Sequence, residues 1–172
     1  MRGGSPGINL KESSVNRISL RFVRWGTGLL ALGLLTGYGP LGHYLHGGVK
    51  VRCPWAPVHA HVAVLGWLGF TVFGLVYRAL PSWGTPGPSA AKLATGHLWL
   101  SIISILGVWL NGTMGYRLID RFSPGFYYRP DPDKLRLWLS IDGMFLTVFA
   151  AGCILFMLVV FSVKYEAREG GG

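Results

Sequence analysis

The stretch "HAHVAVLGWLGFTVFGLVYRAL", residues 59–80, is almost entirely apolar, yet it begins with two histidines. About 20 helical residues cross the hydrocarbon core of a bilayer, and this run is long enough to do so. We therefore predict a membrane-spanning helix over residues 59–80, with His59 and His61 at its N-terminal end.

Three further segments have the same length and character: residues 22–44, 96–116 and 138–163. The chain has 172 residues, of which 51% are hydrophobic and only 13% are charged, a balance that is unusual for a soluble domain. The predicted fold class is all-α, an integral membrane four-helix bundle that forms one domain over residues 22–163. Two tails flank it, a cytoplasmic N-terminal tail (residues 1–21) and a flexible C-terminal tail (residues 164–172).

The formal charge of +9 does not indicate a nucleic-acid-binding protein, because the basic residues are spread over both tails and every loop. In a membrane protein such residues set the orientation of the chain. Nine of the 16 basic residues lie on the side of the two tails, and seven lie on the opposite side. The positive-inside rule then predicts that both termini are cytoplasmic. The expected location is the inner (cytoplasmic) membrane of a bacterium or archaeon.

The histidines are the candidate functional residues, because ionisable side chains inside a membrane are costly and usually functional. Residues two apart on a helix point about 200° away from each other, so His59 and His61 serve opposite faces. Those faces suit two different haems, or one haem and one hydrogen-bonded structural histidine. His97 begins the third span about 25 Å from His61 along the helix, too far for one bis-imidazole iron. His43 and His46 lie at the same side of the membrane as His61, and either could be its partner.

Glycine and aromatic residues follow the two histidines. Gly66 and Gly69 thin the helix so that a flat macrocycle or a neighbouring helix can approach, and Trp67 can pack against a porphyrin edge. Plain helix packing explains the glycines equally well. In the first span, Gly33 and Gly37 have the small-xxx-small spacing that brings two helices close together.

Three other features carry polar groups. Tyr77, near the end of the second span, is expected at the membrane interface. Asp142 is placed near the start of the fourth span, where a carboxylate suits the positive end of the helix dipole, with a proton-relay role as the alternative. The loop over residues 117–137 combines charged and aromatic residues, which predicts either a membrane-interface belt or a docking face.

Residues 57–81, "PVHAHVAVLGWLGFTVFGLVYRALP", resemble the tenth helix of the catalytic subunit of haem-copper oxidases, closest to the C-family type. The shared pattern is H-x-H, L-G-W, F-G and Y-x-x-x-P, and NnrS-type membrane haem proteins have a similar helix. Residues 96–115, "GHLWLSIISILGVWLNGTMG", resemble the helix that follows. The chain is also similar to short four-span proteins described as oxidase subunit I-like. The resemblance implies that His59 is a high-spin-type and His61 a low-spin-type haem ligand.

The chain departs from the oxidase pattern in one decisive respect. An oxidase needs three copper-binding histidines, including an H-P-x-x-Y element and a consecutive histidine pair, and this sequence contains neither motif. The chain alone is therefore not expected to reduce oxygen to water, and no catalytic residue is predicted.

The leading hypothesis is a membrane subunit that binds one haem b, or two, and transfers electrons within a respiratory-type complex. The candidate cofactor-binding residues are His61, His59, His46, His43, Trp67, Gly66 and Gly69, with His61, His59 and His46 as candidate iron ligands. The expected partners are the lipid bilayer, other membrane subunits or copies of the chain itself, and a cytochrome or other redox protein on the outer side. Two alternatives remain: a cofactor-free structural or assembly subunit, and an NnrS-like protein that binds nitric oxide on a haem held by His59.

Overall fold

The computed structural model describes residues 10–47, 61–115 and 132–164, with the side chains of the first helix described over residues 16–36. The elements are α1 (Leu10–Gly47), η1 (Val62–Gly69), α3 (Phe70–Trp83), α4 (Ala90–Leu110), η2 (Asn111–Gly115) and α6 (Pro132–Phe161). The π-helix η1 continues directly into α3, and α4 continues into the π-helix η2. Within the described residues four helices are long and apolar enough to cross a membrane, which confirms the predicted all-α, four-span fold.

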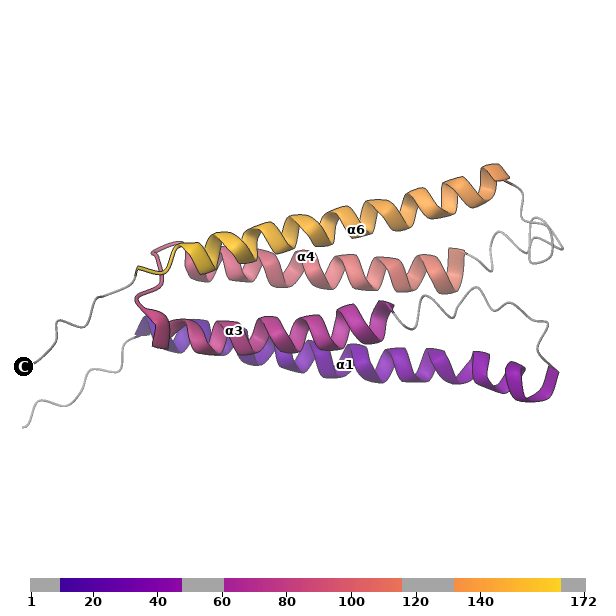
Figure 1. Cartoon of the computed structure of the whole chain (residues 1–172), viewed down its shortest axis with the longest axis horizontal. Coiled ribbons are helices and arrows are strands. Elements are labelled where there is room, and N and C mark those ends of the chain that lie inside the picture. The colour runs from indigo at the N-terminus through magenta and orange to yellow at the C-terminus, as the bar shows by residue number, and fades with distance from the viewer. Residues whose placement is uncertain (1–9, 48–60, 116–131, 165–172) are drawn as a thin grey trace, which may run out of the picture.

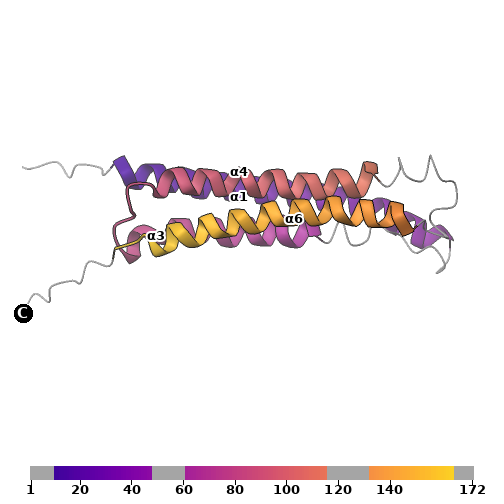
Figure 2. The same ribbon diagram turned by 90° about the horizontal axis from the view of Figure 1, so that it is seen from above.

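The four helices run alternately up and down along one long axis, as Figure 1 shows. They remain close to parallel when the bundle is seen from above (Figure 2). Helix α1 packs mainly against η1 and α3, and α4 packs mainly against α6; contacts of α4 with α1 and η1 join the two pairs. The start of α1, the α3–α4 connection and the end of α6 lie at the same end of the bundle. There, Thr85 and Lys164 pair through two backbone hydrogen bonds of 3.2 and 3.1 Å.

Three helices begin earlier than predicted: α1, α6 and also α4, which begins at Ala90 rather than at residue 96. Helix α1 begins at Leu10 rather than at residue 22, so the second half of the predicted N-terminal tail is helical. Ile18 and Phe22, four residues apart and both buried, show that the core-facing stripe extends into this segment. Helix α6 begins at Pro132 rather than at residue 138, with Asp133 in its first turn. Proline and an acidic residue both favour a helix N-terminus, which accounts for the earlier start.

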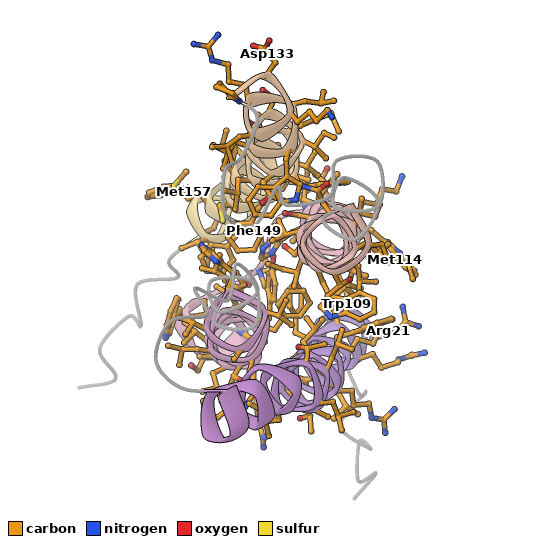
Figure 3. The ribbon with its side chains drawn as sticks, turned by 90° about the vertical axis from the view of Figure 1, so that its right-hand side faces the viewer. Arg21, Trp109, Met114, Asp133, Phe149 and Met157 are labelled. Atoms are coloured by element: carbon orange, nitrogen blue, oxygen red, sulfur yellow. The ribbon has the colours of Figure 1, made fainter. Side chains whose placement is uncertain are left out.

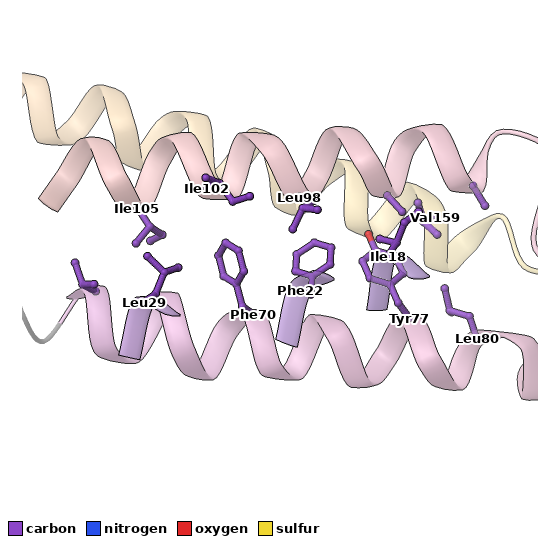
Figure 4. Close-up of a cluster of buried hydrophobic side chains, with 13 residues drawn as sticks. Ile18, Phe22, Leu29, Phe70, Tyr77, Leu80, Leu98, Ile102, Ile105 and Val159 are labelled. Atoms are coloured by element: carbon purple, nitrogen blue, oxygen red, sulfur yellow. The ribbon is translucent and has the colours of Figure 1, made fainter. Parts of the chain in front are cut away.

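The core lies where α1, α3 and α4 meet, and its buried side chains form one row along the bundle axis (Figure 4). Lipid tails are as apolar as the protein core, so the hydrophobic effect does not drive helices together in a membrane. They associate mainly through close packing, small residues and polar contacts. Glycines supply the close packing between α1 and the second span. A side-chain carbon at Gly33 would lie 3.2 Å from the backbone nitrogen of Ala63, and one at Gly74 would lie 2.9 Å from Val23. The predicted packing role of Gly33 is confirmed.

Helix α6 forms the outer edge of the bundle. Only 11% of its most apolar window is buried, against 50% for α4. Met157 points away from the other helices in Figure 3, whereas Phe149 points toward the centre of the bundle. The uncovered face of α6 is apolar, which is the expected surface for contact with lipid or with another membrane helix.

Candidate cofactor site

His61 is the described residue at the head of the second span. It is the N-cap of η1, its backbone is helical (φ −61°, ψ −45°), and its imidazole is exposed in the described part of the chain. π-Helical segments occur frequently at functional sites. The next turn of the helix packs closely against α1 at Gly66, where a side-chain carbon would lie 2.9 Å from Leu29. His61 therefore stands at the start of a segment that is tightly packed on α1.

A cluster of polar groups joins α4 to α6 at the same end of the bundle. The side-chain amide of Asn111 donates hydrogen bonds to Asp142 Oδ1 at 2.9 Å and to the carbonyl oxygen of Trp138 at 3.1 Å. The indole N–H of Trp138 donates in return to the carbonyl oxygen of Asn111 at 3.1 Å. Asn111 thus holds the carboxylate of Asp142, and Trp138 holds Asn111, within the membrane-spanning region.

His61 and Asp142 belong to the same depth of the bundle. Gly66 lies beside Ile105 of α4, with 3.5 Å between Ile105 and a side-chain carbon built at Gly66. Since the second span and α4 are antiparallel, His61 is level with the residues around Asn111, the partner of Asp142.

The interpretation of Asp142 as a residue at a helix start was wrong. Because α6 begins at Pro132, Asp142 lies almost three turns inside the helix, where the dipole effect has faded. Its carboxylate instead accepts a hydrogen bond from the side-chain amide of Asn111. The sequence analysis did not identify Asn111 and Trp138. The signal for Asn111 was its position at the end of an apolar span, where a polar side chain needs a hydrogen-bond partner.

The remaining predicted residues of the second span differ in their exposure. Gly66 is buried against α1, so helix packing explains it fully. Gly69 is more open, with Phe73 at 3.8 Å as the nearest neighbour of a side-chain carbon built there. Trp67 is 42% exposed and belongs to the outer surface of the second span. Open space beside Gly69 and Trp67 leaves both residues available to a flat ligand or a second chain.

His59 and the side chains of His43 and His46 lie outside the described residues, so their ligand roles stay predictions. The backbone of α1 is helical through both positions. Gly33 lies beside Ala63, which makes residue 35 of α1 level with His61. At about 1.5 Å per residue, His43 is then about 12 Å and His46 about 16 Å farther along α1. His43 is the nearer of the two candidates.

His97 lies at the opposite end of the bundle from His61, as predicted, and it is packed inside the core. It is fully buried, and its Nδ1 is 2.9 Å from the hydroxyl of Tyr77. The rings of Phe22, Phe73 and Phe156 surround the imidazole, with centroids 4.9, 4.5 and 5.5 Å away. The predicted interface position of Tyr77 was wrong, because this residue is also fully buried. A buried polar side chain about two turns into the span of α4 requires a partner, and Tyr77 provides it.

The chain is similar to a protein described as "Cytochrome c oxidase subunit 1 homolog, bacteroid" from Bradyrhizobium diazoefficiens, with 32% identity over 65 residues. The match covers 35% of this chain and 12% of that protein, so the chain spans only a small part of its relative. No family model matches the sequence, and no solved structure matches it. The resemblance to an oxidase subunit is thus supported over part of a four-span membrane protein.

Proposed function

We propose that the protein is a haem b-binding membrane subunit that transfers electrons within a respiratory-type complex, with His61 as an axial ligand of the iron. The observation that carries the proposal is the placement of His61: an exposed imidazole at the head of a membrane-spanning helix. The partial similarity to an oxidase subunit 1 homolog points in the same direction.

The residues around His61 fit a haem ligand on chemical grounds. A ligating histidine almost always has a second polar group, often a carboxylate, that orients its ring. Asp142, held by Asn111, lies at the same depth of the bundle as His61. The exposed apolar side chains that follow His61, among them Val64 and Trp67, offer an apolar surface to a flat macrocycle. His43 is the better-placed candidate for the second axial position, with His46 as its alternative. A bound haem would supply one-electron chemistry, and the chain would supply ligation, orientation and exclusion of water.

The expected partners follow from the shape and the charges of the bundle. The uncovered apolar face of α6 suits lipid, another subunit or a second copy of the chain. His59 would serve a second haem, a partner chain or a backbone acceptor. The surplus of basic residues on the side of the termini supports an orientation with both termini in the cytoplasm. The His61 end would then face the outer side, where a cytochrome or another redox protein can dock.

Purification in detergent followed by a pyridine haemochrome assay tests the proposal. Wild-type protein is expected to contain haem b and to give a reduced-minus-oxidised spectrum, which His61→Ala should abolish. Val64→Ala is the control, because Val64 is on the same helix and its side chain is 54% exposed. An unchanged spectrum in His61→Ala would rule out His61 as a ligand. Wild-type protein without haem would favour the cofactor-free assembly subunit.

Two further measurements refine the assignment. His43→Ala and His46→Ala should differ, with loss of the six-coordinate spectrum in the variant that lacks the second ligand. Anaerobic addition of nitric oxide separates an electron carrier from a gas-binding haem protein. A six-coordinate haem should show little change in its Soret band, whereas a five-coordinate haem on His59 should show a marked shift.

A further inference from the structure

Helix α1 carries two arginines that the bundle leaves uncovered. Arg21 and Arg24 are both exposed, and Arg21 lies on the outside of the bundle in Figure 3. Among the described residues, neither guanidinium has a hydrogen bond or an ion pair. What these two charges can bind depends on how deep they lie in the membrane.

The packing of α1 on the second span places Arg24 near the middle of that span. A side-chain carbon at Gly26 would lie 3.1 Å from Phe70. One at Gly74 would lie 2.9 Å from Val23. Arg24 lies between these two α1 contacts, so it is level with the residues between Phe70 and Gly74. Those residues are about ten positions, or roughly 15 Å, from either end of the second candidate span. A snorkelling arginine side chain does not extend that far.

The apolar surface of α6 shows that hydrocarbon surrounds the bundle at this depth. The imidazole of His97 contacts the rings of Phe22 and Phe156, with centroids 4.9 and 5.5 Å away. Phe22 of α1 is therefore level with Phe156 of α6. The surface of α6 is still apolar closer to its C-terminal end, where Phe161 is 83% exposed. Arg21 adjoins Phe22 in the sequence, so the bilayer that covers this part of α6 also reaches Arg21.

An arginine at this depth needs an anionic partner. Charged side chains inside a membrane are rare, and they almost always face the bundle interior or a water-filled cavity and pair with another group. Arg21 and Arg24 instead face away from the bundle. Their charges are thus directed at whatever covers α1 from outside.

The two arginines belong to an exposed stripe of α1 that suits a neighbouring helix. Its members are spaced alternately three and four residues apart, and all are exposed: Arg21, Arg24, Gly28, Ala31 and Leu35. This is the spacing at which two helices pack side by side. A side-chain carbon at Gly28 would meet nothing within 4 Å, and small residues let membrane helices approach closely. A lipid headgroup would use the arginines and leave the rest of the stripe unexplained.

We propose that this stripe docks a membrane-spanning helix of a different subunit, and that an Asp or Glu side chain of this helix pairs with Arg21 and Arg24. Arginine binds a carboxylate through two parallel hydrogen bonds, and the attraction is weakly screened in hydrocarbon. A symmetric contact between two copies of the chain would place the same arginines opposite each other, which opposes self-association through this stripe. The proposal requires no haem, so it stands or fails independently of the proposed function.

Photo-crosslinking in cells of the native host tests the proposal. Trp25→p-benzoylphenylalanine places the probe beside the stripe, exchanges one aromatic residue for another and keeps the stripe intact. Mass spectrometry of the adduct should identify a membrane-spanning peptide of another protein, with an Asp or Glu within about two helical turns of the cross-linked residue. Met157→p-benzoylphenylalanine is the matched control, because Met157 is 47% exposed on α6 next to Phe156, and it should not capture this peptide.

Three variants test the role of charge. The yield of the adduct should fall about tenfold or more in Arg21→Gln/Arg24→Gln, because the partner would keep a desolvated, unpaired carboxylate. Arg21→Lys/Arg24→Lys keeps both charges and should retain most of the adduct. Arg78→Gln removes an exposed arginine outside the stripe and should leave the yield unchanged. Because Arg21 and Arg24 are exposed, all purified variants should unfold at the same SDS concentration as the wild type.

Several results would overturn the proposal. Position 25 would then give no adduct, an adduct with phospholipid alone, one with a second copy of the chain, or one with a helix that lacks a carboxylate in the stated range. A yield that is unchanged in the glutamine pair, or that falls equally in the lysine pair, would also contradict a role for charge. The haem content of the wild-type protein is measured separately and bears only on the proposed function.

Discussion

The hydrogen bond between Tyr77 and His97 should contribute measurably to the free energy of unfolding of the bundle. Both side chains are fully buried, and the hydroxyl lies 2.9 Å from Nδ1 of the imidazole. Within the described part of the chain, Nε2 of His97 has no hydrogen-bond partner. Tyr77→Phe therefore removes the one bond that the structure gives this imidazole, while it leaves the surrounding rings in place.

The expected loss can be bounded from two sides. A buried polar group left unsatisfied costs about 1–3 kcal/mol in proteins generally. Polar contacts between membrane helices contribute less, about 0.6 kcal/mol on average and about 1.7 kcal/mol at most. Because Tyr77→Phe leaves the imidazole with no partner at all, we expect a loss near the upper membrane value, about 1.5 kcal/mol. That is roughly a tenfold change in the ratio of folded to unfolded protein.

Reversible unfolding in mixed lipid–detergent micelles, titrated with SDS and followed by tryptophan fluorescence, measures this loss. A double-mutant cycle with His97→Leu isolates the pair, since it subtracts the packing change of each single variant. The coupling should be about 1 kcal/mol or more. A coupling below about 0.3 kcal/mol, the usual error of additivity, would refute the assignment of His97 as a structural residue held by Tyr77.

Other positions give predictions of known sign. A side-chain carbon at Gly107 would overlap the ring of Phe145, so Gly107→Ala should destabilise the α4–α6 pair by about 1–3 kcal/mol in the same unfolding assay. Gly143 on α6 has open space around it, so Gly143→Ala should be neutral or stabilise the helix by up to about 1 kcal/mol; equal losses in both variants would contradict the packing of α4 on α6. With both native cysteines replaced, a membrane-impermeant maleimide should label Arg136→Cys in intact cells and Ser89→Cys only after permeabilisation. The reverse labelling pattern would overturn the proposed orientation.

Hydropathy predicts the number of spans correctly because the bilayer imposes a minimum apolar length on every crossing helix. It predicts helix ends less well, since a helix continues beyond the membrane wherever its residues can pack or be solvated. Leu10 starts α1 in a polar segment for that reason. The signal for the start of α6 was present in the sequence, as a proline followed by an aspartate, and misjudging that start led directly to the wrong interpretation of Asp142.

The polar contacts were harder to predict from single spans. Tyr77 was assigned to the interface because tyrosine is enriched there, but its partner His97 is twenty residues away and belongs to another helix. Only the register between the second span and α4 shows that the two side chains meet. The π-helices η1 and η2 leave no simple mark either, because they arise from a shift of backbone hydrogen bonds rather than from residue type.

The two ends of the bundle use histidine in different ways, and the difference decides which imidazole can hold iron. Three phenylalanine rings and Tyr77 pack directly against the imidazole of His97. A macrocycle could therefore reach this histidine only by displacing core side chains. The imidazole of His61, by contrast, is exposed in the described part of the chain. An axial ligand needs an accessible nitrogen and an oriented ring. His61 meets the first condition and His97 does not, which favours His61 and makes the His61→Ala spectrum the decisive test of the proposed ligand.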